Sequence, residues 1–168
     1  MSIDPLTVAI ITISDSRALG SKEEDRSGQV IREIVAAAGY EVVFSKLIAD
    51  DLEAIKLALI QVCEAGVHLV LTTGGTGLAP RDNTPEATKA VLEKEAPGIS
   101  EAMRYHSLQI TPRAMLSRGV SGIRGQSLIV NLPGSPKAVR EHLTYVLPTL
   151  RHGIEVLRQA VKECESAY

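Results

Sequence analysis

The sequence predicts an α/β fold in which a mostly parallel sheet carries helices on both faces. Three segments of strand length, residues 6–13, 40–48 and 67–73, are rich in apolar residues, many of them β-branched. Segments whose apolar residues recur at helical spacing separate these strands, and both of them stop at a glycine. Strands that alternate with helices favour parallel pairing through right-handed crossovers.

The length and composition indicate one domain over residues 1–168, long enough to bury a sizeable core. Eighteen Lys and Arg stand against 20 Asp and Glu, which leaves a formal charge of −2, and the chain has four Tyr, one Phe and no Trp. A nucleic-acid surface needs a basic face and stacking aromatic side chains. We therefore expect no nucleic-acid partner.

Neither the cysteines, the N-terminus nor the apolar runs point to an oxidising compartment or a membrane. Cys63 and Cys164 lie about a hundred residues apart, each in a helical pattern, so we expect reduced thiols and no metal or redox pair. The N-terminus has no basic stretch followed by an apolar one, and no apolar run approaches the ~18 residues of a membrane span. The prediction is a soluble, cytoplasmic protein without a membrane partner.

The first strand, residues 6–13, leads directly into Ser14, Asp15 and Ser16. Short polar side chains at the carboxyl end of a strand are where open α/β sheets bind ligands. A simple turn with Asx-type hydrogen bonds explains the same residues equally well. A polar surface loop over residues 17–27 and a helix that ends before Gly39 are expected to follow.

The second and third units repeat this pattern. A strand over 40–48 precedes a helix over 52–63, and residues 50–53 (Asp-Asp-Leu-Glu) resemble a capping box with Asp50 at the cap. The strand over 67–73 then enters a glycine-rich loop. Beyond the loop, Thr84 is expected to cap a helix that has Pro85 at its first position and runs to about Lys94.

The last third of the chain is predicted less completely. We expect a helix from Pro97 to a stop at Thr111 and Pro112, short strands over 115–118 and 120–123, a turn at Arg124 and Gly125, and a strand over 127–131.

Ser135 then caps a final helix with Pro136 at its first position. Pro148 is expected to break or restart this helix. The directions of the strands over 115–131 do not follow from the pattern.

The glycine-rich loop is the strongest candidate for a binding site. Residues 72–77 contain three glycines and three threonines, so the backbone can adopt positive φ and turn its N–H groups toward an anion. The loop lacks the Gly-Lys-Ser/Thr ending of a P-loop, and Pro80 stands where a dinucleotide fingerprint needs its third glycine. A loop that only turns the chain is the alternative.

Asp82 and Asp50 suggest that a cation accompanies the anion. A carboxylate beside phosphate oxygens is repulsive unless a cation lies between them, which points to Mg²⁺. In a parallel sheet, Ser14–Ser16, Asp50 and Asp82 would meet at one edge, where two carboxylates could hold Mg²⁺ against a triphosphate. The alternatives are a salt bridge or cap for Asp82, beside Arg81, and a helix cap for Asp50.

Other catalytic patterns are absent from the sequence. The four histidines show no i, i+4 pairing and no glutamate at metalloprotease spacing, so we expect surface or core histidines rather than ligands. They are His68, His106, His142 and His152. No Gly-x-Ser-x-Gly nucleophile elbow occurs, which disfavours covalent hydrolase chemistry.

Two motifs resemble the molybdenum-cofactor biosynthesis family. Residues 72–88 (TTGGTGLAPRDNTPEAT) are similar to the family signature, and residues 131–139 (NLPGSPKAV) to its second motif. Residues 12–16, 97–103 and 114–118 also look like family landmarks, so the resemblance covers essentially the whole chain. Within the family the chain is most similar to the free-standing molybdopterin adenylyltransferases and the gephyrin G domain.

The resemblance implies a three-layer α/β/α domain, commonly a homotrimer, that uses Mg²⁺ and ATP to adenylylate molybdopterin and releases pyrophosphate before metal insertion, with a possible molybdenum-insertion partner protein. It implies catalytic and metal-binding roles for Asp50 and Asp82. A non-catalytic pterin-binding or carrier protein of the same pathway is the alternative. The expected phosphate- and nucleotide-binding residues are Ser14, Asp15, Ser16, Thr73, Gly74, Gly75, Thr76 and Gly77. The expected pterin-binding residues are Pro133, Gly134, Ser135 and Pro136, for which a proline-stiffened helix entry is the structural alternative.

Overall fold

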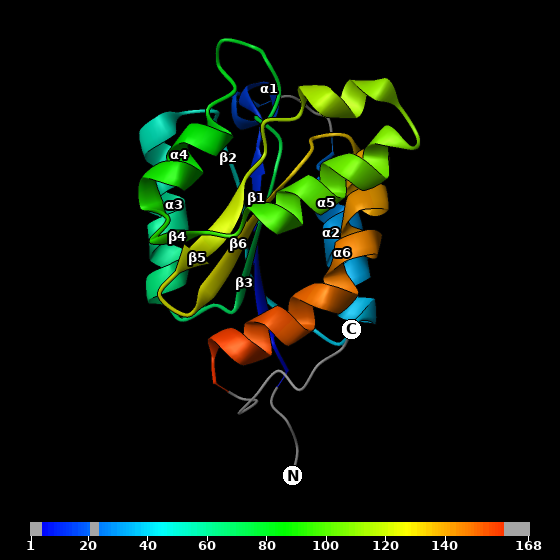
Figure 1. The fold of residues 1–168 in the computed structure, drawn as a ribbon. Coiled ribbons are helices and arrows are strands. Elements are labelled where there is room, and N and C mark those ends of the chain that lie inside the picture. Colours follow the sequence, from blue (N-terminus) through cyan, green and yellow to red (C-terminus); the bar gives the residue numbers. More distant parts are fainter. Residues whose placement is uncertain (1–4, 21–23, 160–168) are drawn as a thin grey trace.

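The computed structural model describes residues 5–20 and 24–159 and contains one six-stranded sheet between two layers of helices (Figure 1). The strands are β1 (Thr7–Ile13), β2 (Glu41–Ile48), β3 (Leu69–Thr73), β4 (Lys94–Glu95), β5 (Ser121–Arg124) and β6 (Ser127–Leu132). The helices are α1 (Asp15–Ala18), α2 (Arg26–Ala37), α3 (Leu52–Glu64), α4 (Thr84–Val91), α5 (Pro97–Leu108), the 3₁₀ helix η1 (Pro112–Leu116) and α6 (Pro136–Leu157).

The sheet has the strand order β2-β1-β3-β6-β5-β4. β1 pairs in parallel with β2 and β3, and β3 pairs in parallel with β6. β5 and β4 complete one edge in antiparallel pairing, joined to β6 by a hairpin whose Gly125 has a φ of +57°. The carboxyl ends of the four parallel strands therefore meet at one edge of the sheet.

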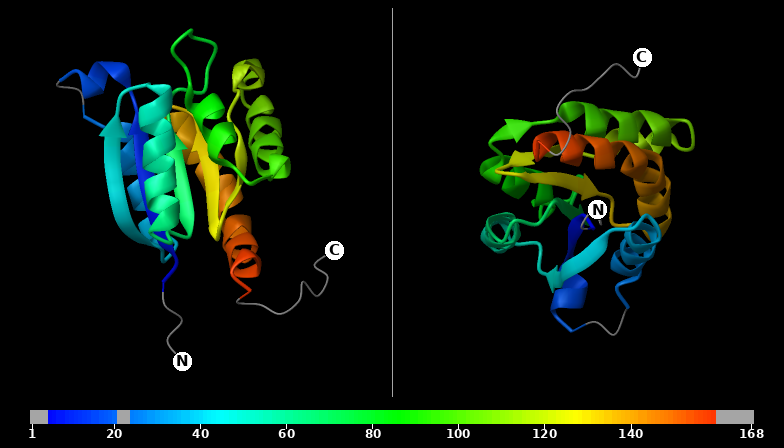
Figure 2. Two further views of the ribbon diagram at one scale, coloured as in Figure 1. Left: turned by 90° about the vertical axis from the view of Figure 1, so that its left-hand side faces the viewer. Right: turned by 90° about the horizontal axis from the view of Figure 1, so that it is seen from below.

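Two apolar cores lie on the two faces of the sheet. Alternate residues of β1 separate between them: Val8 and Ile10 face the core under α2, α5 and α6, whereas Ala9 and Ile11 face the core under α3 and α4. Figures 1 and 2 show the same division of the helices. The predicted three-layer α/β/α fold with a mostly parallel sheet is confirmed. One domain over residues 1–168 stays a prediction.

Of the two adjacent aspartates before α3, only one caps the helix. Asp51, and not Asp50, caps α3, because its carboxylate accepts the N–H of Ala54 at 2.8 Å. The cap predicted for Asp50 is therefore wrong. Ser135 caps α6 as predicted, by accepting the N–H of Ala138 at 3.4 Å.

Helix α4 departs from the prediction at both ends. Asn83 occupies its N-cap, and Thr84 is the first helical residue because its hydroxyl donates to the Gly74 carbonyl at 3.0 Å instead of capping the helix. The helix ends at Val91 and not near Lys94, since Leu92 is extended with a ψ of 139° and the chain continues into β4.

Three further predictions need correction. The strand expected over 115–118 is wrong: Thr111 caps the helical turn η1, which Pro112 opens. The loop expected over 17–27 is shorter, because α1 extends to Ala18 and α2 begins at Arg26 under the cap of Asp25.

Pro148 neither breaks nor restarts the last helix but lies inside the continuous α6, which changes direction along its length (Figure 1).

The remaining sequence expectations concern thiols, histidines and membrane spans. Cys63 is half-buried with a free thiol, and Cys164 lies outside the described residues. His68 accepts the backbone N–H of Thr7 at 2.9 Å, which is a structural role. No helix in the described part of the chain combines the length and the apolar character that crossing a membrane requires.

His142 predicts a pH-dependent stability. Its side chain is buried between α5 and α6, hydrogen-bonded to the Ser107 hydroxyl, with Nδ1 lacking a partner in the described structure. Burial lowers the pKa of His142, and His106 lowers it further, against the opposing effect of Glu141. The unfolded chain therefore binds this proton at higher pH, and stability falls as the pH drops below about 6.5.

We expect His142→Gln, which cannot titrate, to destabilise the protein less at pH 5.5 than at pH 7.5. Urea unfolding of both proteins at the two pH values measures this difference. A difference that stays constant, or grows at the lower pH, would contradict the assignment.

Candidate functional site

The candidate site lies where the loops after β1, β2, β3 and β6 meet at the carboxyl edge of the sheet (Figure 1). Hydrogen bonds join these loops directly. The N–H of Ser14 donates to the Ile48 carbonyl at 3.0 Å, and the Thr73 hydroxyl donates to the Pro133 carbonyl at 2.7 Å. The two loops that carry the sequence motifs are thus fastened to one another.

The glycine-rich loop presents a run of free backbone amides. Gly74 and Gly75 have φ values of +98° and +65°. The N–H groups of the next residues, from Gly75 through Leu78, make no hydrogen bond within the described part of the chain. Thr76 is buried, where unpaired amides are uncommon. Consecutive free amides in a tight loop form an anion-binding concavity.

Gly74 lies against the backbone of β1. A Cβ built on Gly74 would lie 2.2 Å from the Ile13 carbonyl oxygen, and the residue also has positive φ. At Gly66, where φ is +77°, no atom of the described residues other than its chain neighbours lies within 4 Å of such a Cβ. An alanine would therefore be strained by positive φ at either position, but its Cβ would overlap with the backbone of β1 only at Gly74.

We expect Gly74→Ala to lower the free energy of unfolding by about 3 kcal/mol or more, and the control Gly66→Ala by about 1 kcal/mol. Urea unfolding curves of the two variants check this. Equal losses would show that the close approach to Ile13 does not matter.

Asp50 is a buried acid that touches the glycine loop. It is 7% exposed, and its Oδ1 accepts the N–H of Asn83 at 3.0 Å. A Cβ on Gly75 would lie 2.6 Å from Asp50 Oδ2, so only glycine allows this contact. Burial raises the pKa of Asp50; Asp82 and Asp15 raise it further, while the Asn83 N–H and Arg81 act against them.

Asp82 lies across the far end of the same loop. Its Oδ2 accepts the N–H of Ala79 at 3.1 Å and would lie 2.8 Å from a Cβ on Gly77. The salt bridge considered between Asp82 and Arg81 does not form, because the Arg81 Nε donates to Asp15 Oδ2 at 2.5 Å instead.

Asp15 and the two neighbouring serines, which the sequence proposed as phosphate ligands, are already engaged within the protein. Asp15 accepts the backbone N–H of Asp50 at 2.9 Å and pairs with Arg81, whose hydrogen bond is the main cause that lowers the pKa of Asp15. Ser14 caps α1, and its hydroxyl lies 3.3 Å from that of Ser16. Asp15 thus orients the segment that carries Asp50.

The residues predicted on the pterin side lie beside the glycine loop. A Cβ on Gly134 would lie 3.4 Å from the Cα of Gly74, and Pro133 receives the bond from Thr73. Ser135 and Pro136 form the cap and first residue of α6, so the structural reading of their spacing holds. A role in pterin binding stays a prediction for all four residues.

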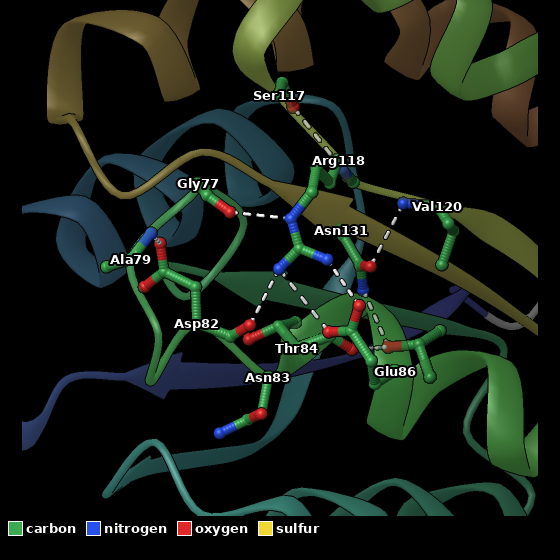
Figure 3. A network of polar contacts seen from close by, with 12 residues as sticks. Gly77, Ala79, Asp82, Asn83, Thr84, Glu86, Ser117, Arg118, Val120 and Asn131 are labelled. Atoms are coloured by element: carbon green, nitrogen blue, oxygen red, sulfur yellow. Dashed lines mark hydrogen bonds and ion pairs between the residues drawn. The ribbon is translucent and has the colours of Figure 1, made fainter.

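Sequence reasoning missed two polar residues that organise the site (Figure 3). Arg118 donates to the carbonyl oxygens of Gly77 and Asp82, both at 2.7 Å. Asn131, only 2% exposed, donates to the hydroxyls of Thr72 and Thr88. A polar residue at the end of an apolar strand was a signal for Asn131. Arg118 ends the segment 114–118 that looks like a family landmark, but this segment did not indicate its contact with the glycine loop.

The chain offers part of a metal site. Among the described residues, no group of three or more His, Cys, Asp or Glu side chains could hold a metal ion. Asp50 and Asp82 border the same loop, and two carboxylates supply only some of the oxygen ligands that Mg²⁺ requires. Mg²⁺ commonly takes its remaining ligands from water and from substrate phosphates.

The raised pKa of Asp50 predicts that its ionised carboxylate lowers the stability of the free protein. This cost is absent below the unfolded pKa of about 4 and appears as the pH rises through the higher folded pKa. We expect Asp50→Asn, which keeps the acceptor for Asn83, to be more stable than the wild type at pH 7.5. Urea unfolding from pH 7.5 to 4.5 measures the difference, which should shrink at acid pH. A less stable variant at pH 7.5 would contradict this.

Free loop amides and two acids at the carboxyl edge of a mostly parallel sheet are typical of the class of α/β proteins that bind ligands at that edge. Within this class the family is defined by sequence. The chain belongs to the family described as "Probable molybdopterin binding domain", which matches residues 9–152.

The chain is also similar in sequence and structure to several known proteins. The molybdopterin adenylyltransferase of Helicobacter pylori strain J99 is 43% identical over 158 residues, covering 89% of this chain and 86% of the relative. Gephyrin of Dictyostelium discoideum is 49% identical over 117 residues, covering 70% of this chain but 16% of gephyrin. Among solved structures, the crystal structure of the molybdopterin biosynthesis enzyme MoaB of Thermus thermophilus superposes on this chain with a TM-score of 0.84. The two sequences are 46% identical, and the match covers 90% of this chain and 96% of MoaB.

Proposed function

We propose that this protein is a molybdopterin adenylyltransferase in molybdenum cofactor biosynthesis, which transfers AMP from ATP to the phosphate of molybdopterin and releases pyrophosphate. The observation that carries the proposal is the run of free amides from Gly75 through Leu78 between Asp50 and Asp82. The relatives that bear this enzyme name and match most of the chain support it.

Electrostatics supports a divalent cation in this reaction. A triphosphate bound to the loop amides would lie beside the Asp50 and Asp82 carboxylates. The negative charges would repel one another, and most strongly at Asp50, which is buried away from water. Mg²⁺ held by the two carboxylates and by phosphate oxygens would neutralise this charge.

The protein's own part in the reaction is to bind and align the substrates. The molybdopterin phosphate oxygen forms the new bond to the α-phosphorus of ATP while the bond between that phosphorus and the bridging oxygen to the β-phosphate breaks. The loop amides hold the phosphates, and the segment from Pro133 to Pro136, fastened to Thr73, would place the pterin beside them. No protein nucleophile is required, since alignment and charge neutralisation lower the barrier.

We also propose that the protein is a homotrimer, and an exposed apolar surface supports self-association. Several large side chains around α5 and η1 are exposed, among them Tyr105 at 68%, Met115 at 65% and Leu116 at 49%. Neighbouring apolar side chains of this size are typical of an interface between subunits. The adenylylated product would pass to a molybdenum-insertion partner protein.

Asp82→Asn tests the catalytic proposal. With ATP radiolabelled at the α-phosphate, Mg²⁺ and molybdopterin, we expect the wild type to label the pterin with AMP and the variant to be slower by about 100-fold or more, because the cation loses a ligand. Molybdopterin affinity should stay within about twofold of the wild type, since the change removes no pterin contact.

Asp51→Asn is the matched control, because asparagine keeps the helix cap and this side chain faces α3. It should retain full activity. The alternative, a non-catalytic pterin carrier, predicts a wild type that binds molybdopterin tightly and never transfers AMP. That outcome, with an active relative working in the same assay, would overturn the proposed function.

A further inference from the structure

Arg118 connects the segment between η1 and β5 to both ends of the loop that carries Asp82 (Figure 3). Its Nε donates to the Gly77 carbonyl and its Nη2 to the Asp82 carbonyl, both at 2.7 Å. Its own backbone N–H donates to the Thr76 carbonyl at 2.9 Å. One residue therefore binds three carbonyl groups of the glycine loop and its continuation.

These bonds determine where the loop amides point. No peptide bond in the described chain is cis, and in a trans peptide the N–H points opposite to the carbonyl of the preceding residue. The carbonyls of Thr76 and Gly77 face Arg118, so the N–H groups of Gly77 and Leu78 face away from it. Both are among the free amides of the proposed phosphate site.

The same geometry reaches both acids. Because the Asp82 carbonyl faces Arg118, the next N–H, that of Asn83, points the other way and donates to Asp50 Oδ1 at 3.0 Å. Arg118 also restrains the backbone of Asp82 directly, because the carbonyl that it binds belongs to Asp82. A single guanidinium thus fixes the backbone at Asp82 and the hydrogen bond that orients Asp50.

Arg118 is itself held by the protein around it. Glu86, in the first turn of α4, forms an ion pair with the guanidinium. Burial would raise the pKa of Glu86, but the bond from Arg118, with further favourable contacts, lowers it below its usual range. Two residues along the chain, the N–H of Val120 donates to the buried Asn131 side chain at 3.1 Å. The arginine is anchored to the polar core.

We propose that Arg118 is a positioning residue for the Mg²⁺–triphosphate site, which sets the loop amides and the Asp50 and Asp82 carboxylates in their binding geometry. This inference rests on the proposed function. Bonds independent of Arg118 close the rest of the loop: Thr84 donates through its N–H to Gly75 and through its hydroxyl to Gly74. Loss of Arg118 should therefore disturb the site and leave the fold in place.

The variants Arg118→Met, Arg118→Lys and Glu86→Gln test this inference against Arg124→Met. Arg124 is the matched control, since its guanidinium also donates to a backbone carbonyl, that of Val91 at 2.9 Å, at the opposite end of α4. Lysine lacks the planar fork that reaches two carbonyls, so Arg118→Lys should rescue only part of the loss.

Mn²⁺ binding in the presence of ATP, measured by electron paramagnetic resonance without pterin, is the first readout. We expect Arg118→Met to weaken it by about 10- to 100-fold, the range for residues that orient metal ligands, and Arg124→Met to change it less than about twofold. The Mg²⁺ concentration for half-maximal AMP transfer should rise in parallel, while the Kd for molybdopterin stays within about twofold.

Each outcome decides between the two proposals. An active wild type with Mn²⁺ binding in Arg118→Met equal to that of Arg124→Met overturns the role of Arg118 alone. A wild type that binds Mn²⁺ with ATP, loses this in Arg118→Met and never transfers AMP overturns the proposed function alone. A wild type that binds no Mn²⁺ with ATP overturns both. If Arg118→Met fails to fold, Arg118→Lys and Glu86→Gln decide by the same comparison.

Discussion

The whole site depends on the close approach of the glycine loop to β1 and to Asp50. The backbone at Gly74 passes so near the Ile13 carbonyl, and that at Gly75 so near the Asp50 carboxylate, that a single added carbon would overlap with either. Both residues also have positive φ, which glycine adopts without strain. This approach brings free amides and a buried acid into one small space, which no loop with side chains at these two positions could do.

The charges around this loop predict that the site lowers the stability of the protein in the absence of ligand. Asp15, Asp50 and Asp82 gather at one edge of the sheet, and the neighbouring Arg81 forms its salt bridge with Asp15. Asp50 remains a buried acid whose pKa is raised, chiefly by burial. Functional sites commonly hold groups that a stability optimum would remove. A cation bound between the acids and a phosphate would turn this repulsion into attraction.

A buried network of hydrogen bonds around Asn131 lies next to the site. Asn131 uses both its amide nitrogen and its oxygen to join β3, α4 and the chain before β5. Such a network is rigid when all its members are satisfied, and it costs free energy when one is removed. The network thus restrains β3, the strand that leads into the glycine loop. Catalysis by alignment of substrates requires preorganisation of this kind.

The sequence by itself determined the fold class, the order of strands and helices over most of the chain, and the meeting of the glycine loop, Asp50 and Asp82 at one sheet edge. These features follow from local periodicity and from the geometry of parallel strands. Only the tertiary structure decided that Asp51 caps α3 and frees Asp50, that Arg81 pairs with Asp15, and that Arg118 binds the loop. The two arginine contacts join residues that lie dozens of positions apart, so they depend on the packed positions of whole elements and leave no pattern along the chain. The cap is local, but two adjacent aspartates offer the same pattern, and the choice between them goes with the contact of Asp50 to the distant Asn83.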